Sequence, residues 1–159
     1  MSKEEKTNVM RILEQNKIPY SGFRYTSSPV TVGTEIARIL GEDPERVFKT
    51  LVTTGKSGEH YVFVIPVSKE LDLKKAAKAV NEKSVEMLPQ KALLPLTGYI
   101  HGGCSPIGMK KFFTTVFHKT AEDREKIYFS AGKVGYQVEV SPSDISKVIR
   151  FTYEDITVD

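Results

Sequence analysis

The chain has 159 residues, of which 40% are hydrophobic and 27% are charged. This length fits one domain, and the composition is that of a globular protein, which excludes a disordered or fibrous chain. The 23 basic and 20 acidic residues give a net charge of +3, a mild excess that permits an anionic partner without requiring one. The single cysteine excludes an internal disulfide and favours a reducing compartment.

The first six residues are mostly charged and contain no apolar signal core. The longest apolar run, residues 61–65, is far shorter than the ~20 residues that a membrane span needs. We therefore expect a cytoplasmic protein without membrane association, made of one domain that covers residues 1–159.

Alternating helix and strand patterns fill the first half of the chain. Val9, Ile12 and Leu13 have the i, i+3, i+4 spacing of an amphipathic helix, which ends before Pro19 because the residue before a proline avoids the α conformation. The pattern then predicts a short strand at 23–25 and a helix that Thr34 caps and Gly41 ends. A strand at 47–54 and a hairpin loop at 54–59 follow. The next strand, at 60–67, is apolar throughout, and we expect it to be buried on both faces.

A third helix is predicted around Leu73, Ala76, Ala77 and Val80, which match the i, i+3, i+4, i+7 template. Asp72 suits the N-terminus of this helix. Its lysines, at positions 74, 75 and 78, are expected on the outer, solvated face.

The second half is richer in strands. We expect a helical turn at 90–94, a glycine-rich loop at 98–108, strands at 114–118, 126–130 and 136–140, and a last helix at 143–149 that Ser141 caps and Pro142 begins. Because the strands come in runs, we predict an α+β domain built on a curved, barrel-like, mixed or antiparallel sheet flanked by helices.

The loop from Gly98 to Gly108 is the first candidate site, because it holds four glycines together with a histidine, a cysteine, a serine and a proline. Successive backbone N–H groups in such a loop can hold a carbonyl oxygen or a phosphate. The alternative is a tight turn between two elements. The spacing does not match a nucleotide-binding P-loop.

Cys104 follows His101 by three residues, which suggests a cysteine–histidine nucleophile pair. The alternative is a cysteine without a catalytic role, because nucleophile and base are matched in space rather than along the chain. One cysteine and three scattered histidines give no zinc spacing, and we expect neither a metal nor a cofactor.

Lys49 is the second candidate, since it interrupts a strand that is otherwise apolar. Its ammonium could bind a phosphate or a carbonyl in a pocket, or its stem could lie along the sheet while its head reaches water. Residues 130–133 could add a hydroxyl or backbone donors, or form a plain hairpin turn. Tyr20 could stack on a base or pack within its own domain.

Several of these stretches resemble the YbaK family, also called the EbsC or bacterial Cys-tRNA(Pro) deacylase family, which is similar to the editing insertion domain of prolyl-tRNA synthetase. The likeness runs from about residue 6 to residue 149 and is carried by residues 48–52, 61–67, 70–78, 83–89, 98–111 and 130–133.

This resemblance implies a trans-editing enzyme that clears cysteine from tRNA(Pro), because a synthetase pocket for proline cannot strongly reject a near-isostere. It implies a catalytic role for Lys49 and for the backbone amides of Gly102 and Gly103. It also implies that substrate contacts come from Tyr20, Thr50, His101, Cys104, Ser105, Pro106, Ser130 and Gly132.

The chemistry implied for cysteine-specific members needs no enzyme nucleophile, because the substrate's own thiol attacks its ester carbonyl. The implied partners are the 3′ end of aminoacyl-tRNA(Pro) and prolyl-tRNA synthetase. Three alternatives stay open: a deacylase of the same fold for another amino acid such as alanine, a non-catalytic module that binds tRNA or a synthetase, and an enzyme that uses Cys104 with His101.

Overall fold

Helices and strands of this protein are mixed along the chain in a computed structural model that describes residues 6–25 and 33–159. Residues 1–5, most of the charged N-terminal segment, therefore lie outside the described residues. The helices are α1 (Asn8–Gln15), α2 (Gly33–Leu40), α3 (Leu73–Ala79), α4 (Gln90–Thr97) and α5 (Pro142–Ile145), with a 3₁₀ helix, η1 (Lys119–Asp123). The strands are β1 (Ser21–Arg24), β2 (Phe48–Gly55), β3 (His60–Pro66), β4 (Val85–Met87), β5 (Thr114–His118), β6 (Ile127–Ser130), β7 (Tyr136–Val140) and β8 (Thr152–Glu154).

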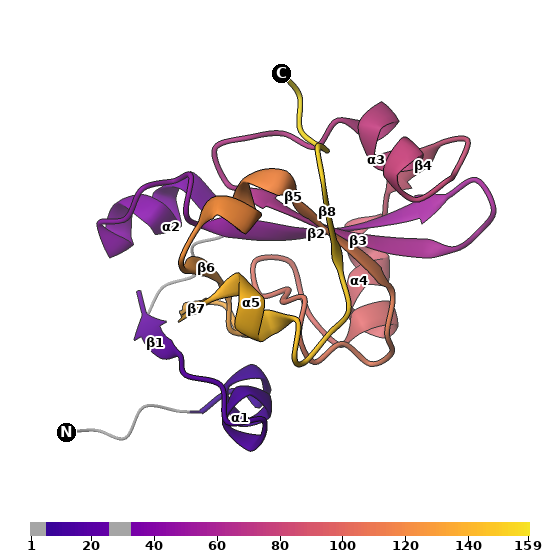
Figure 1. Ribbon diagram of the computed structural model, residues 1–159. Coiled ribbons are helices and arrows are strands. Elements are labelled where there is room, and N and C mark those ends of the chain that lie inside the picture. The colour runs from indigo at the N-terminus through magenta and orange to yellow at the C-terminus, as the bar shows by residue number, and fades with distance from the viewer. Residues whose placement is uncertain (1–5, 26–32) are drawn as a thin grey trace.

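The strands form two sheets, which confirms the α+β class (Figure 1). One is antiparallel, in the order β1-β7-β6, and the other is mixed, in the order β4-β2-β3-β5-β8. Within the described residues the strands do not close into a barrel. Strands β4 and β8 were not predicted, because three residues are too few to show a period of two, and they exist through their pairing with β2 and β5.

The two sheets meet where β2 begins. Val47 forms an isolated bridge with Tyr128 of β6, and the Tyr128 N–H donates to the Arg46 carbonyl at 2.9 Å. On the other side, the Val67 N–H at the end of β3 donates to the Val47 carbonyl at 2.8 Å. The chain around Val47 is therefore hydrogen-bonded to both sheets, which fixes the start of β2 against β6.

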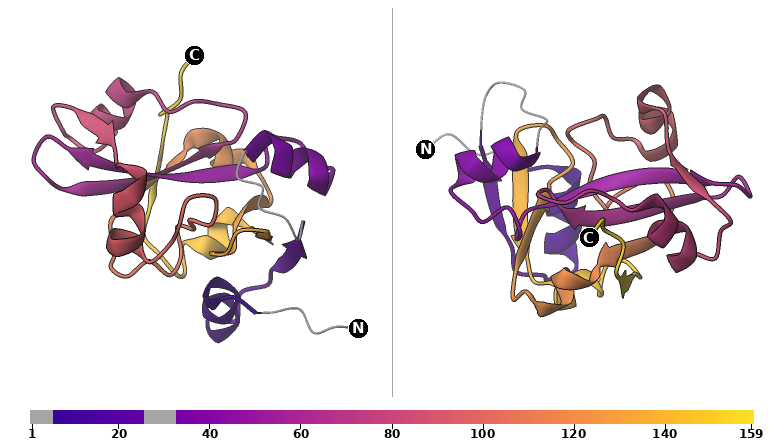
Figure 2. Two further views of the ribbon diagram at one scale, coloured as in Figure 1. Left: turned by 180° about the vertical axis from the view of Figure 1, so that it is seen from behind. Right: turned by 90° about the horizontal axis from the view of Figure 1, so that it is seen from above.

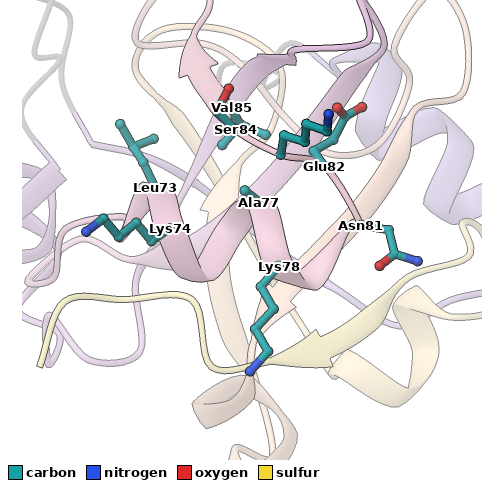
Figure 3. A pocket seen from close by; sticks show the side chains of 9 residues that line it. Leu73, Lys74, Ala77, Lys78, Asn81, Glu82, Ser84 and Val85 are labelled. Atoms are coloured by element: carbon teal, nitrogen blue, oxygen red, sulfur yellow. The ribbon is translucent and has the colours of Figure 1, made fainter.

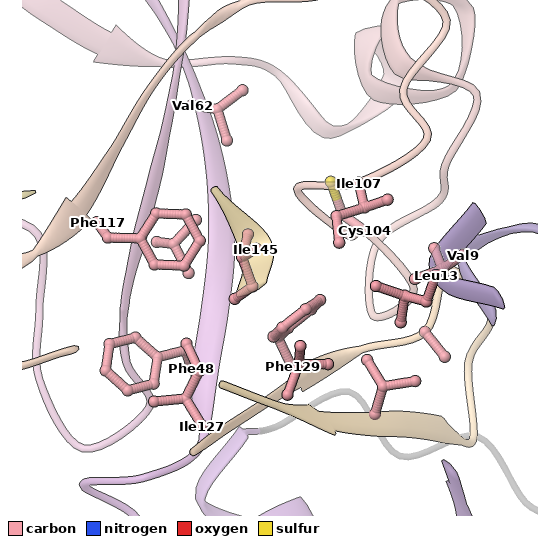
Figure 4. Close-up of a cluster of buried hydrophobic side chains, with 14 of the residues drawn as sticks. Val9, Leu13, Phe48, Val62, Cys104, Ile107, Phe117, Ile127, Phe129 and Ile145 are labelled. Carbon is pink, nitrogen blue, oxygen red and sulfur yellow. The ribbon is translucent and has the colours of Figure 1, made fainter. Parts of the chain in front are cut away.

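The main hydrophobic cluster fills the space between the sheets (Figure 4). Phe48, Phe117 and Phe129 are at most 2% exposed and come from three different strands. Helix α1 covers this cluster with Val9 and Leu13, both fully buried, which are two of the residues whose spacing predicted the helix.

Helices α2 and α3 lie at opposite ends of the long β2–β3 hairpin (Figures 1 and 2). Helix α2 begins at Gly33, so Thr34 lies inside the helix rather than at its cap. Helix α5 ends earlier than predicted, and Ser141 at its N-cap makes no capping hydrogen bond because its hydroxyl contacts that of Ser143.

The outer face of α3 differs from the prediction in two residues. Lys75 is not simply solvated, because its ammonium contacts the carboxylates of Asp155 at 3.2 Å and Asp159 at 2.8 Å. Leu73, expected in the core, is 42% exposed. The Lys75 side of α3 therefore faces residues 155–159, while Lys74 and Lys78 are exposed. In the described part of the chain, no helix is both long and apolar enough to cross a bilayer.

The N-cap of α3 gives a direct test of how this helix is held. The Asp72 carboxylate accepts hydrogen bonds from the Lys74 and Lys75 N–H groups at 3.0 and 3.1 Å. We predict that Asp72→Ala lowers the free energy of unfolding by about 1 kcal/mol in urea titrations, because two backbone donors lose their acceptor. Glu86→Ala, at an exposed residue of strand β4, is the matched control. An equal effect of both substitutions would contradict a capping role.

Candidate functional site

A small pocket lies at the junction of the two sheets. Its volume is about 140 Å³. Its walls come from the start of β2, from the 98–108 loop, from β6 and β7, and from apolar residues of α2, α4 and the end of β3. The lining residues are Ile36, Val47, Phe48, Lys49, Thr50, Leu51, Val67, Leu93, His101, Gly102, Cys104, Ser130 and Gln137. Six residues that the sequence singled out are thus brought together: Lys49, Thr50, His101, Gly102, Cys104 and Ser130.

Lys49 supplies the positive charge of the pocket. It is paired with Ile65 of β3 and is partly buried. Its ammonium makes neither a hydrogen bond nor an ion pair with any described residue. Burial lowers the pKa of Lys49, while the charge of Glu70 opposes that shift. An ammonium held in this way has unused donors that can bind an anionic or carbonyl oxygen in the pocket.

Two hydroxyls accompany Lys49. The buried Thr50 Oγ1 has no hydrogen-bond partner, so it too has capacity for a ligand. Ser130 Oγ is engaged, since it accepts the Gly132 N–H at 3.1 Å. Gly132 itself is absent from the pocket wall. Its φ of +91° and the Tyr99 ring, only 3.0 Å from where a Cβ would lie, require a glycine there.

The glycine-rich loop offers an open backbone donor beside the pocket. The Gly103 N–H is used within the loop, where it donates to the Ile100 carbonyl at 3.0 Å. A Cβ on Gly103 would lie 3.0 Å from the Val134 nitrogen, so the loop packs directly on the 133–134 backbone. The Gly102 N–H, in a residue with φ of +86°, has no acceptor among the described residues. Of the two amides singled out from the sequence, Gly102 is therefore the one able to bind a substrate oxygen.

Three other predicted contact residues lie outside the pocket wall. Ser105 and Pro106 are buried in the loop, where the Ser105 hydroxyl accepts the Ile107 N–H at 3.3 Å. Tyr20 lies between α1 and β1 and donates to the Glu14 carboxylate at 2.5 Å. Burial and this hydrogen bond raise the pKa of Tyr20 to about 12. These residues support the loop or the N-terminal helix.

Cys104 borders the pocket from within the core. Its side chain lies among apolar residues (Figure 4) and is 8% exposed. Burial raises the pKa of the thiol to about 12, so it is un-ionised at neutral pH. No hydrogen bond joins it to His101 within the described residues. Because the thiolate is the reactive form of cysteine, the geometry does not favour a cysteine–histidine nucleophile.

Gln137 is a polar lining residue that the sequence reasoning missed. It is 3% exposed, and its side-chain oxygen has no hydrogen-bond partner. In the sequence Gln137 lies between Tyr136 and Val138. In a strand, such alternation of apolar and polar residues ordinarily places the polar side chain in solvent. Only the packing of the mixed sheet and of Ile36 from α2 over this face makes the position internal.

A larger hollow of about 630 Å³ lies between α3 and β4 (Figure 3). It is lined by exposed residues that include Lys74 and Lys78, and by Glu82, which already accepts a hydrogen bond from Tyr61 at 2.6 Å. It contains none of the residues predicted for the site. We therefore place the candidate site in the junction pocket. Within the described part of the chain, no three His, Cys, Asp or Glu side chains cluster as a metal site.

The state of the Cys104 thiol can be measured directly. We predict that iodoacetamide alkylates Cys104 at pH 8 at least about a hundredfold more slowly in the folded protein than in denaturant, because alkylation requires the thiolate. Mass spectrometry of quenched time points gives both rates. Similar rates in the two states would show that the thiol is ionised and accessible, and would restore it as a candidate nucleophile.

Comparisons with known proteins support the fold described above and identify its family. The chain matches the model of the aminoacyl-tRNA editing domain over residues 28–148. A curated protein of Enterococcus faecalis is 46% identical over 155 residues, covering 97% of this chain and 94% of its own. That protein, EbsC, is named as a candidate Cys-tRNA(Pro)/Cys-tRNA(Cys) deacylase.

Two crystal structures have the same fold at low sequence identity. One, of a hypothetical protein, has a TM-score of 0.85 and 22% identity, and covers 97% of this chain and 100% of its own. Another, described as a candidate trans-editing enzyme for prolyl-tRNA synthetase, has a TM-score of 0.81 and 19% identity, with 95% of each chain covered. The family model and the close relative confirm the resemblance seen in the sequence: this chain belongs to the aminoacyl-tRNA editing domain family.

Proposed function

We propose that this protein is a deacylase that acts in trans on mischarged aminoacyl-tRNA and clears Cys-tRNA(Pro), with residues 1–159 as one editing domain. The observation that carries the proposal is the unpaired Lys49 ammonium in a pocket whose loop also offers the open Gly102 N–H. A cavity of about 140 Å³ suits an aminoacyl group rather than a nucleic acid. Family membership and the name of the close relative support the same substrate class.

The chemistry can proceed without an enzyme nucleophile. The thiolate of the bound cysteinyl group attacks its own ester carbonyl, so that a carbon–sulfur bond forms and the bond to the ribose oxygen breaks. The ribose oxygen takes up a proton, and the products are a cyclic thiolactone and tRNA with a free 3′ end. In this proposal the Gly102 N–H stabilises the developing oxyanion and Lys49 holds the ester or the adjacent phosphate.

The un-ionised Cys104 thiol is consistent with that scheme, since nothing in it requires an enzyme sulfur. Prolyl ester has no thiol and would be spared. A second candidate is Ala-tRNA(Pro), because a pocket that admits cysteine also admits the smaller alanine. That reaction would need water as the nucleophile.

Lys49→Met tests the site, since methionine keeps most of the side-chain volume and removes the charge. We predict that it lowers the rate of Cys-tRNA(Pro) deacylation by about a hundredfold or more, the usual effect of losing an electrostatic contact to the reacting group. Release of labelled amino acid from Cys-, Ala- and Pro-tRNA(Pro) gives the rates and the specificity. Lys74→Met, on the exposed face of α3, is the control.

Each outcome of that measurement points to one function. Loss of cysteine alone, abolished by Lys49→Met, supports thiol-assisted editing. Preferred loss of alanine would keep the site and discard thiol assistance. No cleavage of any ester by the wild-type protein would favour a non-catalytic binding module. Thermal unfolding of both variants shows whether a lost rate reflects lost folding.

Prolyl-tRNA synthetase is the partner that we propose for tRNA selection. The chain carries only a mild positive charge of +3, so its own affinity for tRNA should be weak, salt-dependent and independent of sequence. We predict that the purified protein cleaves cysteinyl esters of tRNA(Pro) and tRNA(Cys) at similar rates, and that added synthetase accelerates the first selectively. Unchanged rates on adding the synthetase would refute the partnership.

A further inference from the structure

Gln137 occupies a buried position in the pocket, where a polar group without a partner destabilises the folded protein. It lies on β7 directly opposite Ser130 of β6 and Phe23 of β1. Side chains of directly paired residues project from the same face of a sheet, and Ser130 also lines the pocket. The flanking residues Tyr136 and Val138 point the other way, into the main hydrophobic cluster. The fold therefore directs the Gln137 amide to the pocket side of the sheet.

The surroundings of this amide are apolar on several sides. Val47 and Val67 line the same pocket and are at most 7% exposed. The nearby Arg46 is already paired, since it contacts the Glu139 carboxylate at 3.1 Å. Gln137 takes no part in that ion pair. Its side-chain oxygen has no hydrogen-bond partner, and the residue is 3% exposed.

A buried amide oxygen without a partner destabilises a folded protein, and such groups are rare outside functional sites. A half-turn of the terminal amide exchanges its oxygen and nitrogen, so the group can present its acceptor to a molecule in the pocket. A hydrogen-bond donor on a bound molecule would supply the partner that this oxygen lacks.

We propose that Gln137 is a substrate-binding residue, whose side-chain oxygen accepts a hydrogen bond from a donor on the aminoacyl-adenosine end of the substrate. This rests on the proposed function, because it takes an aminoacyl ester as the ligand. Two groups there can donate: the α-amino group of the amino acid and the 2′-hydroxyl of the terminal ribose. Both lie within a few bonds of the ester that Lys49 and Gly102 would hold.

The test measures binding, so that it does not depend on catalysis. The probe is a stable analogue in which an amide replaces the ester between cysteine and the 3′ carbon of adenosine. A second analogue lacks the α-amino group, and a third lacks the 2′-hydroxyl. Affinities for all three are measured by calorimetry with the wild-type protein, with Gln137→Met and Gln137→Leu, and with Gln15→Met, an exposed residue at the end of α1, as the control.

We expect Gln137→Met to weaken binding of the complete analogue about tenfold, the typical effect of losing one buried hydrogen bond. The weakening should vanish with the analogue that lacks the donor in question, which identifies the amino group or the hydroxyl. The midpoint of thermal unfolding should stay unchanged or rise, because the variants remove an unsatisfied buried oxygen. A stabilising role for Gln137 would instead lower that midpoint.

The proposal would be overturned if Gln137→Met bound all three analogues like the wild type, or weakened all three equally. It would also be overturned if the wild-type protein bound none of them. If the wild-type protein binds the complete analogue but cleaves no aminoacyl-tRNA, the proposed deacylase activity fails while the assignment of Gln137 is still decided by the three affinities.

Discussion

The hydrogen-bonded junction at the start of β2 is the constraint on which the site depends. The backbone around Val47 bonds to β3 on one side and lies against Tyr128 of β6 on the other. Because of this double attachment, side chains of the mixed sheet and of the antiparallel sheet face one space. Lys49 comes from the first sheet and Gln137 from the second, and neither sheet alone would form the pocket.

The pocket concentrates polar groups that the rest of the fold does not satisfy. The oxygens of Thr50 and Gln137 are buried without partners, and the ammonium of Lys49 has lost part of its hydration. Each of these features opposes folding by itself. Their gathering at one apolar site is the pattern expected where a protein gives up stability for function. Bound substrate would supply the missing hydrogen bonds.

The glycine-rich loop contributes through its backbone more than through its side chains. Close packing of Gly103 on residues 133–134 holds the loop against the β6–β7 connection. This contact places Gly102 at the pocket wall, while Ser105 and Pro106 remain within the loop. Catalysis by such a scaffold would use fixed backbone dipoles, which need no reorganisation during the reaction.

Much of this protein is determined by local sequence. The periodic spacing of Val9 and Leu13, the β-branched run around Lys49 and the glycines of the 98–108 loop indicate the elements and the candidate site, since these patterns depend on near neighbours along the chain. Only the tertiary structure decided that Gln137 is internal, that Tyr20 is not part of the pocket wall, and that the Gly103 amide is already engaged. The burial of Gln137 is set by contacts between segments far apart in the sequence. The acceptor of the Gly103 N–H is only three residues away, but residues 133–134, which pack against this loop, are distant in the sequence.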